Sequence, residues 1–229
     1  MSSPARRTCF LVLLSGALLC ALPAAAVSIK PAPATSWSPQ RLVMEGIRTG
    51  NAQLLRFAWQ RYEEAIRLHP QALEGYLMLG RVFFHLSLLG VATPDEGERA
   101  FTLAQEAVTR APHDPLAHQT MGMVLTGRGR HLDAMESLKL AFQLNPTSEW
   151  VLADMATIHN ALHEPDRTIQ MLEGKTIREG WSYYVLAMAW LQKGDRGKAA
   201  LNLLKARRTG FSGFWTDRAL REIGLPGPR

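Results

Sequence analysis

The fold is decided by the stretch PLAHQTMGMVLTGRGRHLDAMESLKLAFQLNPTS, residues 115–148. Its apolar residues recur three and four positions apart, as they do along one face of an amphipathic helix, and no strand-like alternation persists. Glycines at 127 and 129 interrupt this spacing, and Pro146 ends it because proline cannot continue a helix. The stretch therefore predicts two short helices joined by a tight turn.

Small residues inside the same stretch predict how these two helices pack. Gly122 in the first helix and Ala134 early in the second allow the helix axes to approach closely. Ala141, later in the second helix, leaves room for the next pair of helices to stack. We therefore expect Gly122, Ala134 and Ala141 at helix crossing points.

The same arrangement recurs along the chain. Leu68-His69-Pro70 ends one pair, and Pro112 ends the next, 42 residues further on; Pro146 follows after only 34. The longer unit has about eight extra residues near 88–97, which we expect to form a longer loop. Five units are predicted in all, at 39–72, 73–114, 115–148, 149–179 and 180–213.

The repeated pattern resembles the tetratricopeptide repeat, a helix-turn-helix of about 34 residues with Leu-Gly in its first helix, a small Ala in its second and Pro after it. The corresponding pairs here include Leu79-Gly80, Met121-Gly122 and Leu186-Ala187. The resemblance implies an all-α fold, a right-handed superhelical solenoid of about five repeats over residues 39–213. Residues 214–229 should supply a C-terminal capping helix and tail. The fourth unit is degenerate, because Thr168 and Lys175 replace its small residues.

The N-terminus has the order of a secretory signal peptide. Arg6 and Arg7 precede an apolar run from Phe10 to Leu22, and Ala24-Ala25-Ala26 offers a cleavage site. We expect residues 1–26 to be removed and the Pro/Ala/Ser-rich stretch 27–38 to be a linker, which predicts export to the periplasm. A retained membrane anchor and a eukaryotic secretory lumen are the alternatives.

The charge is unevenly distributed. The chain has 26 Lys and Arg against 20 Asp and Glu, yet residues 175–229 alone have 11 against 4. Aromatic residues lie between these cations, which is typical of a surface that contacts an anionic polymer or a membrane. The alternative is an ordinary solvated helix face. The predicted basic surface consists of Lys198, Lys205, Arg207, Arg208, Arg218 and Arg221.

The family resemblance also implies a binding site, because the first helices of such repeats line a concave groove that holds a peptide. Apolar and aromatic residues dominate the corresponding positions here and would bury an apolar partner segment. The alternative is that the aromatic residues merely pack between neighbouring units. The predicted groove residues are Leu77, Arg81, Phe84, Gln119, Met123, Trp150, Asn160, Trp181, Tyr184 and Met188.

Catalytic and metal signatures are weak. His159 and His163 are spaced to share a helix face and could chelate zinc, but Asn160 stands where the H-E-x-x-H pattern needs glutamate. We interpret both histidines as structural, and we expect no catalytic residues, no metal site and no cofactor. Cys9 and Cys20 both lie in the predicted signal peptide, so no thiol nucleophile is expected in the mature chain.

Together these patterns predict a non-enzymatic scaffold or adaptor that binds a protein or peptide partner in the cell envelope and assists complex assembly. Nucleic acid is not an expected partner of an exported protein, and membrane contact is expected only at the surface. The alternative function is docking of the basic C-terminal end on an anionic envelope polymer or membrane surface. A third alternative is an inactive structural spacer.

Overall fold

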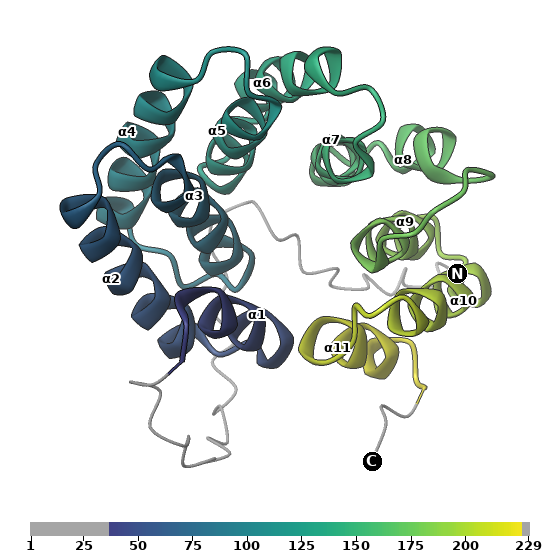
Figure 1. Ribbon diagram of the computed structural model, residues 1–229. Coiled ribbons are helices and arrows are strands. Elements are labelled where there is room, and N and C mark those ends of the chain that lie inside the picture. Colours follow the sequence, from purple (N-terminus) through teal and green to yellow (C-terminus); the bar gives the residue numbers. More distant parts are fainter. Residues whose placement is uncertain (1–36, 226–229) are drawn as a thin grey trace, which may run out of the picture.

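The computed structural model describes residues 37–225, and every regular element in this range is a helix. Two helices fall in each predicted unit, and one more follows the fifth unit (Figure 1). The predicted signal peptide and most of the linker lie outside the described residues. The helices are α1 Pro39–Thr49, α2 Ala52–Leu68, α3 Leu73–Leu88, α4 Pro94–Arg110, α5 Pro115–Gly127, α6 His131–Leu144, α7 Glu149–Ala161, α8 Pro165–Leu172, α9 Gly180–Gln192, α10 Arg196–Arg208 and α11 Phe214–Glu222.

Most of the extra residues of the second unit lie in helices, so the expectation that they form a longer loop is right only in part. They lengthen both helices, since α3 has 16 residues and α4 has 17, against 13 and 14 in α5 and α6, while the connection 89–93 is only slightly longer than 128–130. Thr93 and Glu96 form a capping box that starts α4 directly after a short connection. This local signal begins the helix at Pro94, where proline costs no hydrogen bond.

The small residues of the third unit lie at crossing points, as predicted. A Cβ atom added to Gly122 would lie 2.6 Å from the Cγ atom of Leu138, so only glycine lets α5 approach α6 this closely. Ala134 and Ala141 are fully buried. In the preceding unit, a Cβ atom on Gly80 would overlap the Thr120 side chain and push α3 away from α5.

The solenoid closes on itself, because its first helix touches its last. Figure 1 shows α1 beside α11, and residues of the two ends are in direct contact. A Cβ atom on Gly50 would lie 2.5 Å from the Phe214 ring, and one on Gly213 would overlap the backbone oxygen of Arg48. Both glycines have positive φ angles, which other residues rarely adopt. The array is therefore a ring of helices rather than an open superhelix.

The hydrophobic core extends across the inner side of this ring. Phe84 and Leu88 of α3 and Met123 of α5 belong to the same cluster as the buried residues of α9, α10 and α11. A second cluster joins α1 to α5, and a smaller third cluster joins α5, α6 and α7. Side chains of distant units thus pack together where an open superhelix would expose them.

No helix within residues 37–225 is long and apolar enough to cross a bilayer.

Candidate partner-binding site

Most of the predicted groove is covered. Six of the ten predicted groove side chains are buried, so the expectation that they line an open groove is wrong for them. They are Phe84, Gln119, Met123, Asn160, Trp181 and Tyr184.

An aromatic cluster explains why these side chains are covered. Trp181 stacks on Tyr184 with ring centroids 5.4 Å apart, and Phe84 meets Trp181 edge to face at 6.3 Å. Phe211 contacts both α9 rings, and Trp215 of α11 lies 6.5 Å from Tyr184. Side chains of α3 thus meet those of α9 across the ring, so residues that face a groove in an open array here form a core.

Four predicted groove residues keep exposed surface. Leu77, Arg81 and Met188 are half-buried, and the Trp150 side chain is 40% exposed. The guanidinium carbon of Arg81 lies 5.7 Å from the centre of the Trp150 ring, a cation–π arrangement between α3 and α7. These two side chains define the open part of the predicted site.

Leu116, at the start of α5, is also exposed, to 53%. One turn further along, the Gln119 Nε2 atom of α5 donates to the Asp154 Oδ2 atom of α7 at 2.7 Å. This bond holds α5 and α7 side by side, with Leu116 three residues before its donor on α5 and Trp150 four residues before its acceptor on α7. We call the surface formed by Leu77, Arg81, Leu116 and Trp150 the mouth.

A buried acid lies beneath the mouth. Burial raises the pKa of Asp154 to about 6, although the hydrogen bond from Gln119, the charge of Arg81 and the Trp181 indole counteract this. Sequence reasoning missed Asp154, because a single acid among apolar helix positions has no signature. The available signal was that Asp154 follows Trp150 by one turn and therefore lies on the same face of the helix.

His85 is a second buried ionisable group on the inner side. Burial and the neighbouring charge of Arg81 lower the pKa of His85 to about 3, so the imidazole is neutral near pH 7. Its Nδ1 atom has no hydrogen-bond partner within the described part of the chain. The ring instead packs edge to face on Phe84 and Trp181.

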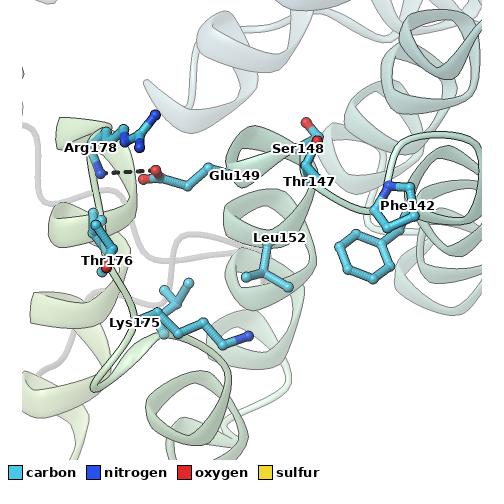
Figure 2. A pocket seen from close by; sticks show the side chains of 11 residues that line it. Phe142, Thr147, Ser148, Glu149, Leu152, Lys175, Thr176 and Arg178 are labelled. Atoms are coloured by element: carbon cyan, nitrogen blue, oxygen red, sulfur yellow. Dashed lines mark hydrogen bonds between the residues drawn. The ribbon is translucent and has the colours of Figure 1, made fainter.

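The degenerate fourth unit contains a cleft that the sequence analysis did not predict. Because α8 ends after eight residues, the connection 173–179 runs past the start of α7 and leaves a cavity of about 410 Å³ (Figure 2). Its lining residues are Phe142, Pro146, Thr147, Ser148, Glu149, Leu152, Leu172, Lys175, Thr176, Ile177 and Arg178. The irregular positions Thr168 and Lys175 were the signal that packing changes here.

The only carboxylate in this lining is already bonded. The Glu149 side chain accepts a hydrogen bond from the backbone N–H group of Arg178 at 2.9 Å (Figure 2). It accepts a second from the backbone N–H group of Glu179, also at 2.9 Å, and so fixes the start of α9. Its role is to hold the start of α7 against the segment that leads into α9. Glu149 and Trp150 are the first two residues of α7. The hydrogen bonds of Glu149 therefore also fix the backbone from which the Trp150 side chain extends.

The predicted basic residues lie on two helices. On α10, the Lys198 Nζ atom lies 3.7 Å from the centre of the Trp190 ring, and that of Lys205 lies 5.6 Å from the centre of the Tyr183 ring. Arg207 is half-buried and Arg208 is exposed. On α11, Arg218 pairs with Glu222 at 3.1 Å, and Arg221 is exposed. The six cations are thus divided between a helix without acids and one in which an acid pairs with Arg218.

The two histidines that could share a metal are placed differently. The His159 Nδ1 atom lies 2.8 Å from the Glu164 carboxylate, and His163 lies in the following turn with a φ angle of 58°. Within residues 37–225, no group of three or more His, Cys, Asp or Glu side chains could hold a metal ion.

Comparison with known proteins agrees with this architecture. Tetratricopeptide repeat protein 33 of Mus musculus is 27% identical over 136 residues, which is 59% of this chain and 49% of that protein. The match therefore spans about half the length of this relative. No family model matches the chain.

Two solved structures have a similar fold. A thermophilic tetratricopeptide-repeat protein of Thermus thermophilus aligns with a TM-score of 0.60 and 19% identity, over 82% of this chain and all of that one. A tetratricopeptide repeat protein from Parabacteroides merdae aligns with a TM-score of 0.63 and 13% identity, over 82% of this chain and 71% of that one. The chain therefore has the fold of tetratricopeptide-repeat proteins, and the fold expected from its sequence is confirmed. This fold generally serves protein–protein interaction.

Proposed function

We propose that the protein is a non-enzymatic scaffold that binds a segment of a partner protein over the mouth. The single observation that carries this proposal is Trp150, a large aromatic side chain that is 40% exposed and has the Arg81 guanidinium over its ring. Tryptophan and arginine are the residues that most often dominate binding energy at protein interfaces. The buried hydrogen bond from Gln119 to Asp154 fixes α7, which carries Trp150, against α5.

The chemistry of the mouth indicates the kind of segment that fits it. Leu77, Leu116 and the Trp150 indole offer apolar surface, while the Arg81 guanidinium can donate to a carboxylate or to backbone carbonyl groups. Arg81 forms no ion pair with a carboxylate of residues 37–225, so its donors remain available. The expected ligand is an apolar segment with an acidic group or free carbonyls beside it.

Partner capture tests this site. Tagged wild-type protein and the Trp150→Ala variant are used to capture partners from the envelope fraction of the source cells, and calorimetry then measures affinity for the recovered partner. The expected result is a loss of about 30-fold in affinity, typical of removing a central tryptophan.

The matched control is Leu132→Ala, because Leu132 is 78% exposed on α6 and lies outside the mouth. This variant should bind like the wild type. Equal affinity of the Trp150→Ala variant and the wild type would refute the mouth as the binding site.

The proposal includes export to the cell envelope, which rests on the signal-peptide order of residues 1–26. Fractionation of the source cells followed by mass spectrometry of the protein's N-terminus tests it. The protein should be found in the envelope fraction and begin at Val27. A cytoplasmic protein beginning at residue 1 or 2 would refute export while leaving the mouth untouched.

A further inference from the structure

The outer face of α10 differs from the other charged surfaces of the molecule. Its sequence, RGKAALNLLKARR, contains five cations and no acidic residue. In the part of the chain that the structure describes, none of the five forms an ion pair with a carboxylate, whereas Arg56, Arg99, Arg110 and Arg128 all do. The cations of α10 are Arg196, Lys198, Lys205, Arg207 and Arg208.

Two leucines lie in the middle of this basic face. Leu201 is 53% exposed and Leu204 is 45% exposed, although burial would stabilise each of them. Because successive residues of a helix are about 100° apart, Leu201, Leu204 and Arg208 fall within about 60° of one another. The opposite face, with Ala199, Asn202, Leu203 and Ala206, is buried in the array.

The remaining cations flank the leucines on both sides. By the same helical geometry, Lys198 and Lys205 lie along one edge of the exposed face, and Arg196 and Arg207 lie along the other. The two lysines extend over the rings of Trp190 and Tyr183. This is the arrangement of an interfacial helix, with apolar side chains at its centre and cations at its edges that reach lipid headgroups.

We propose that α10 docks the protein on the surface of a bilayer that contains anionic lipids. Anionic headgroups would be attracted by charge complementarity, because cations that form no ion pair with a carboxylate lie along both edges of the face. The exposed leucines select a bilayer over a soluble acidic polymer, since only a bilayer offers an apolar layer beneath its charges. Figure 1 shows α10 on the outer rim of the ring, so docking leaves the inner helices uncovered. This inference is independent of the mouth.

The chain contains its own control in α6, the second helix of the third unit. It also exposes leucines, Leu132, Leu140 and Leu144, with exposed fractions of 78%, 47% and 41%. Acids accompany them, however: Glu136 pairs with Lys139 at 2.7 Å, and Asp133 pairs with Arg130 at 2.7 Å. An anionic bilayer should therefore bind α10 and not α6.

The test is vesicle co-sedimentation with full-length protein. Vesicles of phosphatidylcholine with phosphatidylglycerol in equal amounts are compared with vesicles of phosphatidylcholine alone. Two double variants remove the two features separately: Leu201→Ser with Leu204→Ser, and Lys205→Glu with Arg208→Glu. The control is Leu132→Ser with Leu140→Ser. Every protein carries the same N-terminal apolar run, so its contribution cancels in comparisons between variants.

The expected result is that each α10 variant weakens binding to the anionic vesicles by at least about tenfold, since each cation near such a surface contributes appreciably. The α6 control should stay within about twofold of the wild type, because its face carries paired charges. Circular dichroism melting confirms folding, and Leu201→Ala with Leu204→Ala replaces the serine pair if that pair unfolds.

Three outcomes overturn the proposal. In the first, neither α10 variant binds more weakly than the wild type. In the second, only one of them does; a loss confined to the charge-reversal variant, with full competition by soluble polyglutamate, would identify an acidic protein as the occupant. In the third, the α6 control loses as much binding as the α10 variants.

Discussion

Trp150 and Trp181 are the first aromatic residues of α7 and α9, and they stand at equivalent positions in successive units. Trp150 is 40% exposed beside Arg81, whereas Trp181 is 5% exposed among Phe84, Tyr184 and Phe211. The repeat pattern predicts that both side chains point toward the concave side. Their neighbours make the difference, because Phe84 and His85 of α3 and Phe211 after α10 cover the Trp181 ring, whereas the Trp150 ring keeps exposed surface.

The largest effect that separates the two tryptophans should appear in stability. Trp181→Ala is expected to lower the free energy of unfolding by about 3–5 kcal/mol, since it removes a buried indole from a packed aromatic cluster. Trp150→Ala should cost less than about 1 kcal/mol because its site is partly solvated. Chemical denaturation of both variants measures this, and equal losses would contradict the division into core and mouth.

The next effect concerns the acid that links α5 to α7 beneath the mouth. Asp154 has a folded pKa of about 6, above its ordinary value of 3.8, so the folded state binds a proton more tightly than the unfolded state. Its contribution to stability is therefore greatest below pH 4 and is lost as the pH rises to 6, by about 3 kcal/mol in total.

Asp154→Asn should remove this pH dependence. Denaturation of wild type and variant between pH 4 and pH 7 should show the wild type losing stability relative to the variant as the pH rises. His85 gives a pH dependence of stability with the opposite sign. Because the pKa of His85 is lowered from its ordinary value of 6.5, the fold becomes less stable as the pH falls below 6.5. A constant difference between wild type and Asp154→Asn across this range would show that the carboxylate is solvated.

A smaller effect tests ring closure directly. Gly213→Ala should cost about 2–3 kcal/mol, because the added Cβ atom overlaps the Arg48 backbone and the φ angle of 111° is unfavourable for alanine. Gly210→Ala is the matched control, with a φ angle of 92° and no atom within 4 Å of the added Cβ atom. Thermal unfolding of both should show the larger loss at Gly213. If the two losses are equal, the contact between α1 and α11 contributes no stability.

The sequence predicted the architecture well, because the repeat signature depends on local packing. Gly122, Ala134 and Pro146 act within one pair of helices, and each has the role that its position implies. The expectation at 88–97 was right only in part for a physical reason: helix propensity and the Thr93 cap could extend both helices as easily as a loop could absorb the residues.

The site was less predictable, because it depends on closure. The repeat positions identified side chains such as Tyr184 and Met123 as facing inward, but burial of these residues comes from contacts between α3, α9 and α11. Gly50 and Gly213 permit those contacts, and neither glycine belongs to the repeat pattern. A pattern that describes neighbouring helices carries no information on how far the array curves.

The contact between α1 and α11 also limits how this protein can evolve. An open repeat protein gains or loses units by duplication or deletion without disturbing its ends, because each unit touches only its neighbours. Here the number of units is part of the structure: a sixth would separate α1 from α11 and uncover the inner aromatic residues. Variation in this protein is therefore expected as substitutions and short insertions within a fixed set of five units.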